Sequence, residues 1–336
     1  MSLPTPYTRV AVVQLAFHPA IVVERYSPLE DPLFVSKRGD SLRPTSGSTP
    51  ESLHAQLEAL RQRVRKAYGA QLLAKVKAVL ARCQAWNVRL VVFPEYSIPS
   101  DILEAVAQAA GDMVVVAGTH TVERNVRRSG LYTGLGATAN PETGQSVCPV
   151  LHGGKLLALQ PKLNPAVPER ESLKPGASWT PVALPEPLPG PLGVLVCLDF
   201  LYRESPLYQK HVAPRLEACR FLAVPSLTPH HSLGDFDGKA WEEAKRYGRP
   251  VLYCNEAEHG GTSVYVDEKT KKELSQFPER SGLLLRGEEG VIVADVDLGF
   301  RRTGESTPYH APRPVRPVAA ATLVYQARAA ESEYAQ

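Results

Sequence analysis

The chain has 336 residues, 43% of them hydrophobic, so it can bury one large core or two smaller ones. Its net charge is only +3 and its basic residues are scattered, which argues against a nucleic-acid-binding protein. No run reaches the roughly 18 apolar residues of a membrane span, and the first residues lack the features of a signal peptide. The five cysteines form no C-x-x-C pair, so we expect no zinc site and no disulfide framework, but a cytoplasmic protein with reduced thiols.

Short apolar runs that are continuous rather than alternating predict strands buried on both faces. In chain order they are RVAVVQL (9–15), RLVVF (89–93), MVVVAG (113–118), GVLVCL (193–198), RFLAVP (220–225) and RPVLYC (249–254). Helical spacing predicts a long amphipathic helix over 51–86 and further helices over 99–109, 206–218 and 236–247. Turn signals predict hairpins within 131–159 and further strands at 262–266 and 281–297. This order predicts an α/β protein with two packed sheets and helices outside.

Two segments fall outside this alternation. Residues 23–52 are rich in proline, serine, glycine and charge, so we expect a long insertion loop near a pocket mouth or a subunit contact. Residues 301–336 begin polar and proline-rich and then offer one apolar piece, VAAATLVYQ. We therefore expect one domain over 1–300 and a C-terminal tail over 301–336 that contacts another subunit.

The stretch VLVCLDFLYRE places a thiol, Cys197, at the end of an apolar run and follows it with Asp199 and Glu204. Packing is one explanation, because free cysteine is among the most buried residue types. A nucleophile at a strand end is the other, and it needs a base and a cation from elsewhere in the chain.

Two further segments supply those groups. RLVVFPEYS ends its apolar run on Glu95, and QPKLNPAVPERE places Lys162 after the strand KLLALQ with Glu169 beyond it. The prolines stiffen this second segment, and a nearby carboxylate favours the charged form of a lysine. Each signal has an ordinary alternative, a solvated loop acid for Glu95 and a surface ion pair for Lys162 and Glu169.

Taken together, these motifs resemble the nitrilase, or carbon–nitrogen hydrolase, superfamily. That family has a glutamate in an F-P-E-like context, a lysine followed by a proline-containing segment with a second glutamate, and a cysteine in a C-x-D-x-x-x-x-E context. The same marks stand here in the same order, and the resemblance covers about residues 8 to 300. It implies a four-layer α-β-β-α sandwich of two mixed sheets with helices outside.

The resemblance also implies roles for the site residues. Glu95 would be the general base for the Cys197 thiol, while Lys162 and the backbone N–H of Leu198 would stabilise the developing negative charge. Glu169 would orient Lys162 or the substrate. No cofactor is implied, and the family pattern implies a homodimer or a larger homo-oligomer. Because a nearby cation lowers a thiol pKa, we also expect Lys162 to favour the Cys197 thiolate.

Other residues carry weaker expectations. Asp199 and Glu204 are expected to hold the turn and neighbouring backbone. The sequence departs from the family at Tyr202-Arg203, where most members have Phe-Pro, and at Thr133, where the family usually has asparagine. Three further groups of side chains could approach the pocket or form core and turns instead: Tyr202, Trp241 and Tyr253 as pocket walls, His120 as a substrate-binding group, and His230-His231 as a Cys–His or metal partner.

The sequence therefore predicts a hydrolase of a non-peptide carbon–nitrogen bond, in an amide or a nitrile, that works through a cysteine thioester and releases ammonia or an amine. Hydrolysis and acyl transfer to an amine would use the same four residues. A protein of a different class also remains open, a non-catalytic or sensor module of the same fold that binds a small metabolite or a partner protein.

Overall fold

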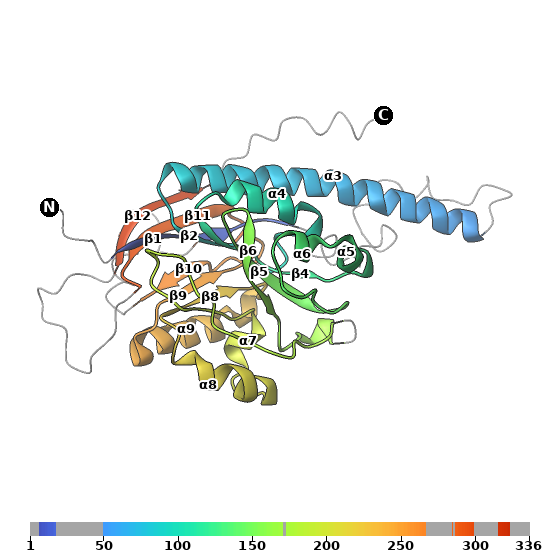
Figure 1. Cartoon of the computed structure of the whole chain (residues 1–336). Helices are drawn as coiled ribbons and strands as arrows, with labels where there is room; N and C mark the ends of the chain where they lie inside the picture. The colour runs from blue at the N-terminus through green and yellow to red at the C-terminus, as the bar shows by residue number, and fades with distance from the viewer. Residues whose placement is uncertain are drawn as a thin grey trace, which may run out of the picture.

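The computed structural model of the chain describes residues 7–17, 50–170, 173–266, 284, 286–298 and 315–322. Two sheets stack face to face, and helices lie on both outer sides of the stack (Figure 1). The chain is therefore a four-layer α-β-β-α sandwich, as its sequence predicted.

The larger sheet has eight strands in the order β12-β11-β1-β2-β3-β5-β4, with β6 paired to β5. Its centre, β1 with β2 and β2 with β3, is parallel, and its other pairs are antiparallel. The strands are β1 (Thr8–Gln14), β2 (Leu90–Val92), β3 (Val114–Val116), β4 (His120–Thr121), β5 (Ser146–His152), β6 (Lys155–Pro161), β11 (Gly290–Val296) and β12 (Val315–Thr322).

The smaller sheet has four strands in the order β10-β9-β8-β7. Two of its three pairings, β7 with β8 and β8 with β9, are parallel, and the pairing of β9 with β10 is antiparallel. The strands are β7 (Leu192–Val194), β8 (Phe221–Pro225), β9 (Val251–Cys254) and β10 (Ser263–Tyr265). Both sheets are thus mixed, and each has a parallel core.

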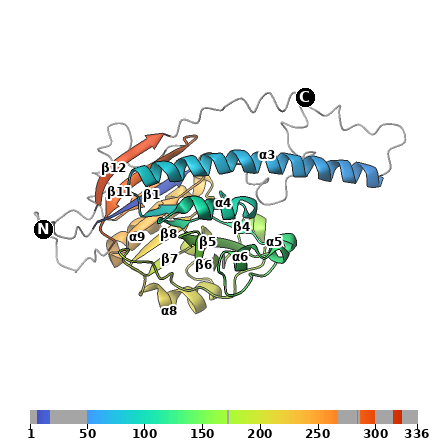
Figure 2. The same ribbon diagram turned by 45° about the horizontal axis from the view of Figure 1, so that its top comes forward.

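Helices α3 and α4 pack side by side over the outer face of the larger sheet (Figure 2), while α7, α8 and α9 lie on the far side of the smaller sheet. The short helices α5 and α6 lie near β4. The helices are α3 (Pro50–Ala85), α4 (Ser100–Ala110), α5 (Arg124–Ser129), α6 (Leu131–Gly134), α7 (Leu198–Leu201), α8 (Ala213–Leu216) and α9 (Leu233–Tyr247). Single helical turns also occur at Val167–Glu169, Tyr208–Val212 and His230–Ser232.

The continuous apolar strands are explained by burial on both faces. In β1, Val10 and Val12 join the core between the two sheets, whereas Ala11 and Val13 join the core under α3 and α4. Successive side chains of a strand point to opposite faces, so the middle of a strand that is covered on both sides is apolar at every position.

Two predicted elements differ in detail. Residues 146–161 form the expected hairpin of β5 and β6, but the start of the predicted hairpin region is helix α6, which follows a left-handed residue, Gly130 (φ 75°). The helix predicted over 206–218 begins as a wide π-helical turn, Tyr208–Val212, before α8. Pro214 has no N–H to donate to residue 210, so a regular α-helix cannot run through this segment.

The predicted insertion loop lies outside the described residues except for its last three, which begin α3. Part of the predicted C-terminal tail, residues 315–322, forms β12 and pairs with β11, so this stretch extends the larger sheet of its own domain. The remaining tail residues, and the predicted subunit contact, lie outside what the structure describes. No helix in the described part of the chain has the length and apolar content needed to cross a membrane.

Candidate active site

Four strand ends, two from each sheet, come together in the middle of the sandwich. Glu95 follows β2 and Lys162 follows β6 in the larger sheet, while Cys197 follows β7 and Leu227 follows β8 in the smaller one. The strand ends are held together by their own backbones, because the amide of Glu95 donates to the Ser226 carbonyl across the two sheets. Loops at the ends of parallel strands are where α/β proteins commonly place reactive groups.

The centre of the cluster is a buried ion triplet. The Lys162 ammonium lies 2.7 Å from a Glu95 oxygen and 2.7 Å from a Glu169 oxygen. Lys162 and Glu95 are each only 1% exposed. The surface ion pair that the sequence left open is therefore not what forms, since two carboxylates hold one ammonium in the interior.

Further donors fix both carboxylates. The second Glu95 oxygen accepts the Leu227 amide at 3.1 Å. On the other side, Glu169 accepts the Ala166 amide at 2.5 Å and the hydroxyl of Tyr96. With most of their lone pairs occupied, the carboxylates are held in one orientation, which is what a preorganised site requires.

Cys197 stands on a sharp turn between β7 and α7. Its backbone has φ 48° and ψ −110°, a left-handed conformation that is uncommon for a residue with a side chain. The turn is held by its own amide, which donates to the Pro225 carbonyl at 2.9 Å. Its sulfur is 3.9 Å from the Thr228 hydroxyl, and the residue is 5% exposed, whereas the other four cysteines are fully buried.

The amide of Leu198 is the first of the short helix α7. The first N–H groups of a helix have no acceptor within the helix, so this amide is available beside the cysteine sulfur. Its predicted role, as a donor to negative charge on a bound substrate, stays a prediction.

Burial in the site shifts the pKa values of both Glu95 and Cys197. Burial raises the pKa of Glu95 to about 7, although the Lys162 charge and the Cys197 thiol oppose that rise. Burial and the negative charge of Glu95 raise the pKa of Cys197 to about 12, and Lys162 offsets only part of this. The expectation that Lys162 would favour a standing thiolate is therefore wrong, and the thiol needs a base to lose its proton.

Lys162 and Glu169 stay charged. Burial would lower the pKa of Lys162, but the surrounding negative groups, Glu95 first among them, raise it well above its usual value. Burial would raise the pKa of Glu169, yet the ammonium and its hydrogen bonds lower it overall. Two carboxylates and one ammonium leave the triplet with one net negative charge when Glu95 is ionised.

Of the two acids that follow the cysteine, Asp199 has the structural role that was predicted. Its buried carboxylate accepts the amides of Leu163 and Asn164 and the Asn164 side chain, at 2.7–3.2 Å, and so ties the cysteine turn to the chain after Lys162. Glu204 is exposed and takes no part in this network.

Tyr202 and Arg203, which replace the usual Phe-Pro, point to different environments. Tyr202 is 57% exposed on the surface beyond α7. Arg203 makes an ion pair with Glu243, a fully buried residue of α9, and its guanidinium lies over the ring of Phe200. The departure therefore anchors the segment after the cysteine to α9 by an ion pair.

His120 is fully enclosed in a hydrogen-bonded pair rather than aimed at the cysteine. Its ring contacts the Ile98 carbonyl at 3.2 Å and the Tyr132 hydroxyl at 2.8 Å. Burial lowers its pKa to about 4, so the ring is neutral. The structure thus gives His120 two internal partners and brings together only Glu95, Lys162, Glu169, Cys197 and Leu198 from the predicted set.

Of the side chains proposed as pocket walls, Tyr253 lies near the cysteine, because it packs against Phe236 and interacts electrostatically with Cys197. Trp241 packs edge-on against Tyr265, and Thr133 donates to the Gly130 carbonyl in a turn. His230 is exposed, with the carbonyl of His259 as its contact. Among the described residues, no cluster of three or more histidine, cysteine or acidic side chains could hold a metal ion.

Two contributors to the site were missed from sequence. Tyr96 follows the motif glutamate directly, and its φ of 61° turns the chain so that the ring reaches Glu169. Leu227 contributes only its backbone, within the stretch VPSLT that resembles the family strand after the nucleophile. The tyrosine could have been suspected from its place beside Glu95, but a backbone donor has no signature in side-chain identity.

Comparisons with known proteins agree with this fold. No family model matches the chain, and no curated protein matches it. Among solved structures, an amidase from Nesterenkonia sp. AN1, as a double mutant in complex with acrylamide, has a TM-score of 0.51 at 15% identity over 88% of this chain and 93% of that chain. A single mutant of this amidase, described as from the nitrilase superfamily, has a TM-score of 0.50 at 16% identity over 88% and 94%.

A glutamine-dependent NAD+ synthetase from Acinetobacter baumannii is also similar, with a TM-score of 0.51 at 15% identity. The match covers 92% of this chain and 49% of that chain, so the chain spans about half of the synthetase. The fold of the chain fits the nitrilase superfamily, as the sequence resemblance predicted, since the amidase that shares it is described as from that superfamily.

Proposed function

We propose that the chain hydrolyses a non-peptide carbon–nitrogen bond, in an amide or a nitrile, through a thioester on Cys197. The observation that carries the proposal is the buried Glu95–Lys162–Glu169 triplet beside a cysteine on a left-handed turn. A structural ion pair has no need of two carboxylates around one ammonium next to a thiol, whereas acyl transfer to sulfur needs a base, a cation and a nucleophile in one place.

In the first step, Glu95 takes the proton of the Cys197 thiol as the sulfur attacks the amide carbon. A pKa of about 7 suits this role, because a base works best when its pKa is near the working pH. The thiol is otherwise neutral, so its deprotonation belongs to the reaction and not to the resting state.

The attack moves an electron pair onto the carbonyl oxygen. Lys162 and the Leu198 amide would stabilise that oxyanion, and losing a single donor of this kind typically costs about 100-fold to 1,000-fold in rate. Glu95 then gives its proton to the leaving nitrogen, the carbon–nitrogen bond breaks, and ammonia or an amine departs. Cys197 is left as a thioester.

Deacylation repeats the same sequence with water. Glu95 takes a proton from a water molecule whose oxygen attacks the thioester carbon. The tetrahedral intermediate then collapses, the carbon–sulfur bond breaks to release the acid, and Glu95 returns its proton to the departing sulfur, so the site ends as it began. An amine in place of this water would give acyl transfer instead.

The charge of the triplet favours a neutral reacting group. Glu95, Lys162, Glu169 and Cys197 together carry a net charge of −1, and this sum does not change when a proton passes from the thiol to Glu95. A second anion beside these groups would be repelled in a low-dielectric interior. Small neutral amides are the first substrates to test, and the amidase structure with acrylamide supports this choice.

The test is ammonia release from a panel of small amides and nitriles, followed by mass spectrometry of the protein after a low-pH quench. We expect an acyl group on Cys197 of the wild-type protein and no turnover by Cys197→Ala. Cys219→Ala is the matched control, because Cys219 is also buried and in no disulfide, but its sulfur faces the Arg215 carbonyl on the far side of the smaller sheet.

Acylation of Cys219, or turnover by Cys197→Ala, would overturn the proposal. If no member of the panel were turned over, and small amides bound without any adduct, the alternative of a non-catalytic sensor module would be favoured. The cytoplasmic location and the homo-oligomer stay predictions of the sequence.

A further inference from the structure

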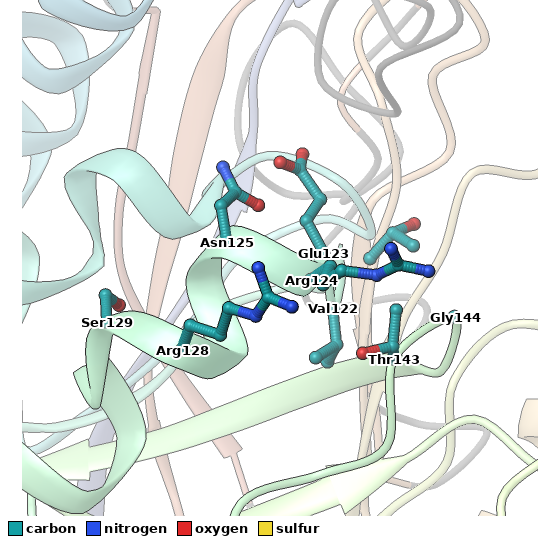
Figure 3. A pocket seen from close by; sticks show the side chains of 9 residues that line it. Val122, Glu123, Arg124, Asn125, Arg128, Ser129, Thr143 and Gly144 are labelled. Carbon is teal, nitrogen blue, oxygen red and sulfur yellow. The ribbon is translucent and has the colours of Figure 1, made fainter.

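A second hollow lies away from the cysteine, where β4 runs into α5. It has a volume of about 930 Å³, which is within the range of small-molecule sites, and Figure 3 shows its side chains. Its walls come from the end of β4, from α5 and from the turn before β5. The lining residues are Thr121, Val122, Glu123, Arg124, Asn125, Arg128, Ser129, Thr143 and Gly144.

The acidic side chain of this hollow has a partner outside it. Glu123 accepts from Arg65 of α3 at 2.8 Å, and its side chain is only 9% exposed. Arg65 also lies 3.3 Å from Asp101 of α4, so this arginine is shared between Glu123 and Asp101. The negative charge of Glu123 is thereby partly offset by an arginine of α3.

The two arginines of the hollow have no such partner. Arg124 and Arg128 are exposed, and neither forms an ion pair with any residue in the part of the chain that the structure describes. They stand four positions apart on α5, so they share one face of the helix, and both guanidinium groups extend on the hollow's side in Figure 3. The side chains that line the hollow therefore carry a net positive charge, even with the carboxylate of Glu123 counted.

Neutral donors complete the surroundings. The hydroxyl oxygen of Thr121 is shielded from solvent and has no hydrogen-bond partner among the described residues, and Thr143 presents a second hydroxyl from the turn that faces α5. A shielded hydroxyl without a partner costs free energy unless a ligand or water meets it. Two planar guanidinium forks and two hydroxyls together offer more donors than the two oxygens of one carboxylate can use.

We propose that this hollow, lined by Arg124, Arg128, Thr121 and Thr143, is a binding site for a small phosphate-bearing molecule. A phosphate group presents three or more acceptor oxygens, which matches the paired guanidinium groups, and the volume leaves room for an organic body attached to the phosphate. The inference goes beyond the proposed hydrolase function and uses none of its residues.

The experiment is calorimetric titration of the full chain with pyrophosphate, inorganic phosphate and succinate at low salt. We expect pyrophosphate and phosphate to bind more tightly than succinate, and binding to weaken as salt is added. The double variant Arg124→Ala/Arg128→Ala should lower the affinity for pyrophosphate at least tenfold. Arg127→Ala is the control, because Arg127 lies on the same short helix and is exposed but does not line the hollow.

Three results would overturn the proposal: no binding of pyrophosphate to the wild-type chain, equal loss in Arg127→Ala and in the double variant, or tighter binding of succinate than of phosphate. Unfolding midpoints without ligand show whether the double variant is folded, and Thr143→Val offers a gentler second test with an expected loss of a few fold. Ammonia release should be unchanged in all these variants, so failure of this site and failure of the hydrolase proposal are distinguishable.

Discussion

Replacing Tyr96 by phenylalanine removes one hydroxyl from the candidate site and leaves its ring in place. That hydroxyl donates to Glu169, whose other oxygen holds the Lys162 ammonium at 2.7 Å. Tyr96 is 3% exposed, so water cannot easily replace the lost donor. The substitution therefore tests whether the tyrosine positions the lysine through the carboxylate between them.

The size of the effect follows from that contact. A hydrogen bond to a charged group contributes about 1.5–3 kcal/mol, and this one favours the ionised form of Glu169. Its loss should therefore raise the pKa of Glu169 and destabilise the protein by about 1.5–3 kcal/mol. A lysine that is less firmly placed should lower kcat/KM about 10-fold to 100-fold, mainly through kcat.

Two measurements on the same protein separate these effects. Ammonia release across pH gives kcat and KM, and urea unfolding gives the free energy of unfolding. Tyr132→Phe is the matched control, because it also removes a buried tyrosine hydroxyl, one that meets the neutral ring of His120 instead of a carboxylate. We expect the control to lose about 1 kcal/mol of stability and to keep its kinetics.

The reasoning fails if Tyr96→Phe loses stability but keeps wild-type kcat and an unchanged pH profile, because the hydroxyl would then be a structural contact only. It also fails if both tyrosine variants lose activity equally, since the effect would then be one of general loosening.

Three other substitutions or conditions should give equally definite results. Lys162→Ala should lower kcat/KM at least about 1,000-fold while circular dichroism shows that the chain stays folded. Lys162→Arg should restore little activity, because a planar guanidinium does not replace a point charge between two carboxylates, and near wild-type turnover by this variant would remove the lysine from the mechanism. Activity should rise with pH as Glu95 ionises around pH 7 and then stay level to about pH 10, since the pKa of Lys162 lies well above 10.5; a rate that is flat between pH 5 and 9 would exclude Glu95 as the base. Gly118→Ala should lower the free energy of unfolding in urea by about 3 kcal/mol and remove most of the activity, because a Cβ there would stand 2.0 Å from the Pro94 carbonyl oxygen and the backbone has a φ of 63°. Gly134→Ala is the control and should be tolerated, because its Cβ would meet nothing within 4 Å.

Much of the fold was predictable because its strands are buried on both faces. Continuous apolar runs around 89–93 and 220–225 leave few other interpretations, and the groups that follow them, Glu95 and Leu227, are held together by the strand ends. The long helix predicted over residues 51–86 from the spacing of its apolar residues is likewise present, as α3. The period of the apolar residues shows which positions are buried, and these elements are the ones whose side chains are buried most regularly.

What the sequence could not supply is how charge and burial combine in three dimensions. Cys197 was expected to be a thiolate because Lys162 is near, but the same neighbourhood brings Glu95 and excludes water, and these two effects outweigh the cation. His120 was expected near the pocket because it ends a strand, yet its ring turns to Tyr132. Both outcomes depend on neighbours that are remote in the chain.

The proposed catalytic groups come from two sheets that pack against each other through their inner faces. Glu95 and Lys162 follow strands of one sheet and Cys197 and Leu227 follow strands of the other, and hydrogen bonds such as that from the Cys254 thiol to the Val92 carbonyl cross between the sheets. A slip of a few tenths of an ångström between the sheets would leave every helix and strand intact and still separate the base from the thiol. Under mild urea or warming, turnover should therefore disappear before the circular dichroism changes, which makes activity the more sensitive gauge of how the two halves of the sandwich are seated.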